Sequence, residues 1–78
     1  MATIAKVDPD VFNRHIYQDE VTNVKAKDLV NDDVIVIQQR AYQVYRIIQL
    51  HGGNLILAFR QGVMLQCMGD SLQQKYNG

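Results

Sequence analysis

The chain has one cysteine, one proline and no tryptophan, and its formal net charge is zero. With Cys67 alone, no disulfide can form within the chain, which argues against a secreted, disulfide-stapled protein and favours the reducing cytoplasm. Because the net charge is zero, the molecule as a whole has no field to attract nucleic acid. These absences predict a cytoplasmic domain whose stability depends on its apolar core.

Long apolar runs are also absent. None approaches the roughly 20 residues that cross a bilayer, and the opening MATIAKVDPD has no apolar run of signal-peptide length. The 78 residues allow one domain, 1–78, with a small stability margin. Residues 70–78 contain few apolar side chains and predict a flexible tail. We expect a single domain with no membrane partner.

Hydrophobic residues nevertheless make up 47% of the chain, and most apolar runs lie within residues 34–68. Val34 to Ile37 are consecutive β-branched residues, which predict a strand. A longer run follows at residues 42–50, and residues 20–25 predict an edge strand. The sequence predicts a mainly β (α+β) fold: a small, bent antiparallel sheet or SH3-like barrel of four to five strands with a short N-terminal helix.

The N-terminal part combines a weak strand pattern with a helix-start signal. Residues 2–7 alternate weakly, as a short first strand or a frayed terminus would. In Asp8-Pro9-Asp10 the first aspartate can cap free amides, and proline suits the first helical position. We expect a short helix that ends near Tyr17 and packs Phe12 and Ile16 against the sheet.

Glycine-bearing turns predict the register of the long strands. The Gly52-Gly53 pair predicts a two-residue hairpin turn, which places Leu50 opposite Leu55. The loop Arg60-Gln61-Gly62 predicts a three-residue turn with a bulge, which pairs the next two strands. One face is then apolar throughout, and we expect it to be the core. Its members are Ile48, Leu50, Leu55, Leu57, Phe59, Val63, Leu65 and Cys67.

The opposite face of these strands is also largely apolar, although a face open to water should be mostly polar. Either the N-terminal helix or another chain must cover part of it. Aromatic residues, Met and Arg are enriched at protein interfaces, so this face predicts a protein partner or a homo-oligomer. The expected contact residues are Tyr45, Ile47, Ile56, Ala58, Arg60 and Met64.

Residues with catalytic or metal-binding chemistry do not cluster along the chain. His15 and His51 stand alone, and Asp32-Asp33 fit a solvated turn. Cys67 falls on the predicted core face, where a thiol behaves as a small hydrophobe. No helix pattern follows the glycine pair to form a phosphate loop. We therefore expect no enzyme, no metal site and no cofactor.

One pattern favours RNA or single-stranded DNA as the alternative ligand. Arginines and aromatic rings interleave on neighbouring strands, and some sheets stack bases on rings while basic side chains meet phosphates. The competing interpretation is a sheet with tyrosines at the rim of the core and arginines extending outward. The residues of this alternative are Arg40, Tyr42, Tyr45, Arg46 and Arg60.

Charge is unevenly distributed between the two halves of the chain. Residues 1–39 carry four basic and seven acidic side chains, a net of −3. Residues 40–78 carry four basic side chains and one acidic side chain, a net of +3. This asymmetry indicates either a partner surface or two halves that attract each other within one fold.

Residues 28–48 (DLVNDDVIVIQQRAYQVYRII) resemble the start of the SH3-like barrels of the translation-protein type, as in elongation factor P. That family opens with a polar lead-in, a β-branched strand, a short polar turn and a strand of the form Tyr-x-Val, which here is Tyr42-Gln43-Val44. The resemblance covers about a quarter of the chain and implies a barrel-like fold. The family's modified loop lysine has no counterpart in residues 51–54, so the resemblance does not imply its ribosomal activity.

These features together predict a non-catalytic interaction module of the cytoplasm that binds a protein partner or itself through an apolar sheet face. Small chains without a disulfide, metal or catalytic cluster also occur as accessory proteins of phages and mobile elements, which is the provenance we expect.

Overall fold

The computed structural model describes residues 9–77, and within them six strands form one antiparallel sheet. The strands are β1 (Val21–Lys25), β2 (Val34–Ile37), β3 (Arg40–Gln49), β4 (Asn54–Phe59), β5 (Met64–Met68) and β6 (Leu72–Tyr76). Their order is β1-β6-β2-β3-β4-β5, so the sheet is open, with β1 and β5 at its edges. The predictions of a mainly β fold and of an edge strand near residues 20–25 are confirmed.

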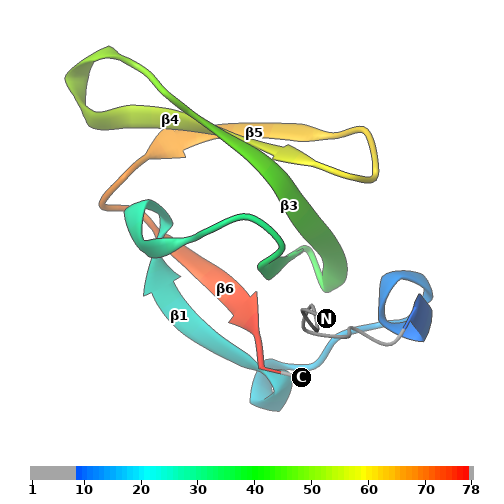
Figure 1. The fold of residues 1–78 in the computed structure, drawn as a ribbon. Helices are drawn as coiled ribbons and strands as arrows, with labels where there is room; N and C mark the ends of the chain where they lie inside the picture. Colours follow the sequence, from blue (N-terminus) through cyan, green and yellow to red (C-terminus); the bar gives the residue numbers. More distant parts are fainter. Residues whose placement is uncertain (1–8, 78) are drawn as a thin grey trace, which may run out of the picture.

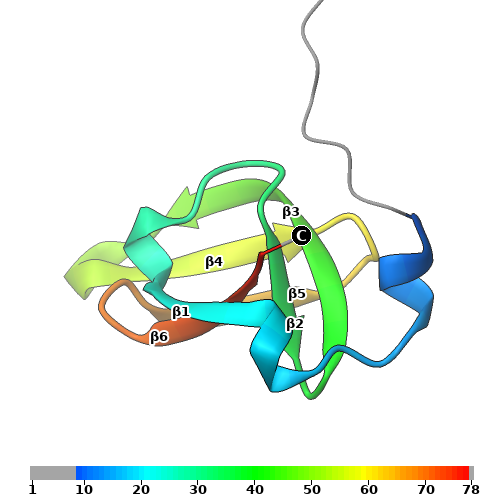
Figure 2. The ribbon, with the colours of Figure 1, turned by 90° about the horizontal axis from the view of Figure 1, so that it is seen from below.

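The sheet bends so that its two halves face each other across the main core. In Figure 1, β3, β4 and β5 lie above β1 and β6, and Figure 2 shows β3 curving alongside β2. Strand β3 belongs to both halves, since it pairs with β2 at its start and with β4 at its end. The buried residues of the main core are Ala26, Leu29, Ile35, Val44, Leu55, Leu57 and Phe59.

Strand β2 is buried on both faces, which explains its run of β-branched residues. Ile35 faces the main core, whereas Val34 and Val36 belong to a second apolar cluster on the other side of the sheet. The rest of that second cluster comes from the N-terminal segment, from β3 and from the margins of β1 and β6. These residues are Val11, Phe12, Ile16, Val21, Ala41 and Tyr76.

The N-terminal segment is not the expected helix to Tyr17. It forms one short 3₁₀ turn, η1 (Pro9–Asn13), and then runs extended over the start of β3. The Ile16 N–H donates a hydrogen bond to the Gln39 carbonyl at 2.9 Å, which fixes the segment on the β2–β3 turn. Burial of Ile16 is therefore confirmed, but the segment covers β2 rather than β4 and β5. The predicted cap Asp8 and strand 2–7 lie outside the described residues.

The prediction of a flexible tail at 70–78 is wrong, because Leu72–Tyr76 form β6. This strand pairs with β1 on one side and with β2 on the other. Its polar side chains are compatible with this position, because Tyr76 is the one side chain of this strand that packs against either apolar cluster. Lys75, for example, reaches the Asp33 carboxylate at 3.5 Å.

The predicted register is correct for the β4–β5 hairpin and wrong for the β3–β4 hairpin. Leu57 lies opposite Leu65, as expected, and Gly62 has the positive φ of 85° that the three-residue turn requires. The β3–β4 loop is one residue longer than predicted, because Leu50 pairs with Asn54 through its N–H. A one-residue change turns the whole strand over.

A bulge at Tyr45 shifts the pairing of β3 with β4 a second time. The register shifts between Val44, which lies opposite Phe59, and Arg46, which lies opposite Ala58. The extra residue lets both Val44 and Ile47 face the main core, although they are three positions apart. Ile48 and Leu50, which were expected in the core, therefore lie on the other face.

Among residues 9–77, three ion pairs join the two halves of the chain. Arg60 contacts Asp32 at 3.3 Å, and Lys75 contacts Asp33. A third pair joins Lys27 to Asp70 at 3.0 Å, and it raises the pKa of the lysine and lowers that of the carboxyl. The first two pairs each join an acid of residues 1–39 to a base of residues 40–78, which supports the interpretation that the two halves attract each other within one fold.

Candidate functional site

The candidate site is the outer face of β3–β4–β5, which points away from the main core. Its membership follows from the observed strand pairing, in which facing residues share a face. Six of its nine residues are apolar, and its only charged side chain is that of Arg46. The nine residues are Arg46, Ile48, Leu50, Asn54, Ile56, Ala58, Met64, Gln66 and Met68.

Large apolar side chains of this outer face are exposed to solvent. Met64 is 69% exposed and Met68 is 59% exposed, while Leu50 is exposed to a lesser degree. Within residues 9–77, no segment packs over this face, because the N-terminal segment lies on β2 and the start of β3. A sheet face of this composition is typical of a surface that meets another molecule.

The outer face contains half of the contact residues expected from the sequence. Ile56, Ala58 and Met64 lie on it, with Ala58 buried between its neighbours and Ile56 half-buried. Tyr45 lies on the bulge at its rim and is 49% exposed. Ile47 does not lie on it: this side chain is half-buried against the main core, because the longer loop reverses the face of β3 between the loop and the bulge.

Sequence reasoning missed Ile48 and Leu50 as members of the outer face. The available signal was the loop His51-Gly52-Gly53, which fits a three-residue turn as well as a two-residue one. Both glycines adopt positive φ, 73° and 79°, so glycine content alone could not distinguish the two loop lengths. The bulge at Tyr45 carries no comparable mark in the sequence.

Arg60 stands at the tip of the β4–β5 hairpin rather than on the outer face. Its backbone N–H donates to the Gln43 carbonyl at 2.9 Å, and its guanidinium is paired with Asp32. It lines a shallow depression together with Tyr45, Phe59 and Gly62. Arg60 therefore anchors the hairpin to the turn before β2 and borders the outer face only through Tyr45.

The residues of the nucleic-acid alternative are not gathered on one surface. The Tyr42 ring is half-buried and packs against the buried Phe59 ring, with centroids 5.5 Å apart. Tyr45 is the only exposed ring of the set. Arg46 lies on the outer face, whereas Arg40 lies beside the β2–β3 turn. The arrangement lacks the row of exposed rings on which single-stranded nucleic acid stacks.

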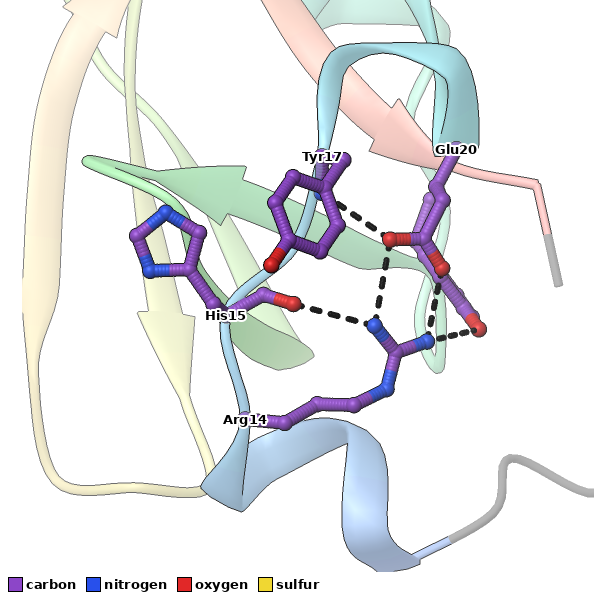
Figure 3. A network of polar contacts seen from close by, with 5 residues as sticks. Arg14, His15, Tyr17 and Glu20 are labelled. Atoms are coloured by element: carbon purple, nitrogen blue, oxygen red, sulfur yellow. Dashed lines mark hydrogen bonds and ion pairs between the residues drawn. The ribbon is translucent and has the colours of Figure 1, made fainter.

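A polar network joins the N-terminal segment to β6 (Figure 3). The Arg14 guanidinium donates two hydrogen bonds to the Glu20 carboxylate, at 2.7 and 3.1 Å, and one to the Tyr76 hydroxyl at 3.2 Å. It also donates to the His15 carbonyl at 3.0 Å. The Tyr17 N–H donates to the same Glu20 carboxylate at 2.9 Å.

These hydrogen bonds stabilise the charged form of the carboxylate. The bonds from Arg14, followed by the one from Tyr17, lower the pKa of Glu20 from 4.5 to about 2. The carboxylate reciprocally raises the pKa of Arg14. Both oxygens of Glu20 accept hydrogen bonds from within the chain. The network therefore has a structural role: it holds the N-terminal segment against the sheet.

Metal-ligating side chains do not come together among residues 9–77: no three His, Cys, Asp or Glu residues are close enough to hold an ion. Cys67 is half-buried and packs against the main core, as its predicted register requires. The His15 ring lies 5.3 Å from the Tyr17 ring, away from the outer face. In the same part of the chain, no helix is long and apolar enough to cross a membrane.

Comparisons with protein-family models, with curated protein sequences and with solved structures gave no match. The resemblance of residues 28–48 to translation-type SH3-like barrels therefore stays a prediction.

Proposed function

We propose that this protein is a small, non-catalytic interaction module that associates with another protein, or with itself, through the outer face of β3–β4–β5. The observation that carries the proposal is the run of apolar side chains across three neighbouring strands, with Met64 and Met68 largely exposed. Burying such side chains against a partner removes apolar surface from water, at about 25 cal/mol per Å².

The composition of the outer face supports a protein rather than a small molecule as the partner. Met, Arg and aromatic residues are the types enriched at protein interfaces, and here Met64, Arg46 and Tyr45 represent each type. The depression beside Tyr45 is shallow and open and does not enclose a ligand. A broad, nearly uncharged surface fits another folded surface or an added strand.

We also propose that the bent sheet corresponds to the SH3-like architecture expected from the sequence. Support comes from η3 (Ala26–Asp28), which follows the edge strand β1 and lies against the end of the other edge strand. There the Lys27 N–H donates to the Gly69 carbonyl at 2.9 Å. A cytoplasmic location remains part of the proposal, on the basis of the single cysteine.

The test compares a charge on the outer face with the same charge elsewhere. Met64→Glu introduces a carboxylate on the outer face, and Leu72→Glu introduces one on β6 at a residue that is 63% exposed. Both changes are at exposed positions and are expected to alter the free energy of unfolding by no more than about 0.5 kcal/mol. If the partner is a second copy, Met64→Glu should abolish the self-association seen by sedimentation velocity. If the partner is another protein, Met64→Glu should abolish its co-purification. Leu72→Glu should change neither result.

Identical behaviour of wild type and Met64→Glu in both measurements would overturn the proposal. Recovery of nucleic acid that is lost steeply as salt rises, and that depends on Arg46, would instead favour the RNA or single-stranded DNA alternative.

A further inference from the structure

Strand β5 presents unpaired backbone groups along the open edge of the sheet. The bonds from Phe59 N–H to the Val63 carbonyl and from Gly69 N–H to the Gly53 carbonyl set the phase of the β4–β5 ladder. By the alternation of an antiparallel ladder, Met64 and Gln66 direct their N–H and C=O groups away from β4. In the described residues no hydrogen bond reaches these groups from outside the sheet.

The two edges of the sheet differ in how they are protected. Edge strand β1 contains Lys25 and the exposed polar side chains of Thr22 and Asn23, and charged residues discourage pairing with another chain. Strand β5, with the sequence MLQCM, contains no charged residue and no proline. The β5 edge is therefore the one open to an added strand.

The sequence of β5 is nearly the same read in either direction. In an antiparallel pair centred on Gln66, Met64 lies opposite Met68 of the second copy, and Gln66 lies opposite its own counterpart. On the inner side, Leu65 lies opposite Cys67 of the second copy, so apolar residues meet apolar residues at every position except the central glutamine pair. The outward groups of Gln66 then exchange both hydrogen bonds across a two-fold axis.

We infer that the β5 edges of two copies of this chain pair antiparallel about Gln66 and join the two sheets into one. This inference rests on the proposed function, because Met64, Gln66 and Met68 also belong to the outer face, and it specifies a second copy as the partner.

The geometry also bounds the strength of association. Stable complexes bury about 1,200–2,000 Å² in total, and two five-residue strands with their methionines cover only part of that area. We therefore expect a dimer that dissociates in the micromolar range or weaker, detected as a sedimentation coefficient that rises with protein concentration.

Disulfide cross-linking tests the orientation and the register directly. In a Cys67→Ala background, Met64→Cys and Met68→Cys proteins are mixed, oxidised and digested for mass spectrometry. Antiparallel pairing sets these two residues about 5.5 Å apart between Cα atoms, within the disulfide range of about 4.4–6.8 Å. Two copies of Met64→Cys would be about 13 Å apart along the strands. We expect mixed 64–68 dimers to exceed 64–64 dimers at least tenfold.

Matched controls separate this inference from the proposed function. Val30→Cys is 62% exposed and distant in sequence from β5, and it should cross-link no faster than random collision allows. Ile56→Cys lies at the centre of the outer face and reports a face-to-face dimer. Efficient 56–56 cross-linking without 64–68 products would overturn edge pairing while leaving the proposed function intact.

A second measurement uses charge at the two edges. Gln66→Lys is expected to raise the dimer dissociation constant at least tenfold, because two lysines would face each other at the axis, while Asn23→Lys on β1 should leave it unchanged. A monomer at every concentration up to the millimolar range would overturn the inference. Only the foreign-partner form of the proposed function would then remain, to be judged by co-purification with wild type and Met64→Glu.

Discussion

Replacing Ile47 by aspartate is expected to destabilise the fold strongly, whereas the same change at the adjacent Ile48 is expected to be mild. Ile47 packs against the main core, and Ile48 lies on the outer face opposite Ile56. Losing a half-buried isoleucine removes about 1–2 kcal/mol of transfer free energy. Placing a carboxyl group against the core without a partner adds about 1–3 kcal/mol. We therefore expect a loss of about 3 kcal/mol at Ile47 and less than about 1 kcal/mol at Ile48.

Urea unfolding followed by far-ultraviolet circular dichroism measures this difference, since the chain has no tryptophan to report by fluorescence. With a denaturant slope of about 1 kcal/mol per M, the midpoint should fall by about 3 M for Ile47→Asp and by less than about 1 M for Ile48→Asp. The alanine variants at both positions keep the comparison possible if Ile47→Asp does not fold. Equal losses, or a larger loss at Ile48, would refute the three-residue loop and the bulge, and would restore the register expected from sequence.

Three further outcomes are expected. Hydrogen bonds lower the pKa of Glu20 to about 2, so its contribution to stability is complete above pH 4.5 and is lost as pH falls toward 2. In acid unfolding, Glu20→Gln should therefore lose less stability between these pH values than the wild type does. Deleting residues 72–78 should abolish cooperative unfolding, because β1 loses the strand it pairs with and β2 keeps only its pairing with β3. A truncated chain that keeps the native circular dichroism spectrum would contradict this. Gln38 and Gln39 have positive φ, 50° and 68°, a conformation that glycine adopts at lower cost than glutamine. Gln39→Gly should therefore raise the free energy of unfolding by about 1 kcal/mol. A lowered urea midpoint would show that this backbone is not strained.

The predictable parts of the fold were those specified by a local signal. Val34 to Ile37 formed a strand because a β-branched run fits a strand buried on both faces. The β4–β5 register followed from Gly62, which takes the left-handed conformation that its turn requires. Strand β6 was not predictable in this way, because its polar sequence has little strand preference and its position depends on pairing with two distant strands.

The sequence predicted that an apolar second face exists, but it did not predict correctly which residues lie on that face. An apolar second face follows from the content of the strands in either register, so its existence did not depend on the turn. Which isoleucine belongs to it did depend on the turn, because a one-residue difference in the β3–β4 loop exchanges Ile47 for Ile48. Two glycines permit both loops, and only the packing of the whole strand against β4 selects between them.

The two faces of β3–β4–β5 also differ in the kind of apolar residue they carry, and the difference bears on function. The inner face uses leucine and phenylalanine, represented by Leu55, Leu57 and Phe59, which are almost completely buried in one packing arrangement. Both methionines of the described chain, Met64 and Met68, lie instead on the outer face. Methionine has three rotatable bonds and a polarisable sulfur, so it adapts to surfaces of different shape. A face that only had to tolerate water would gain nothing from this adaptability, whereas a face that meets another molecule would.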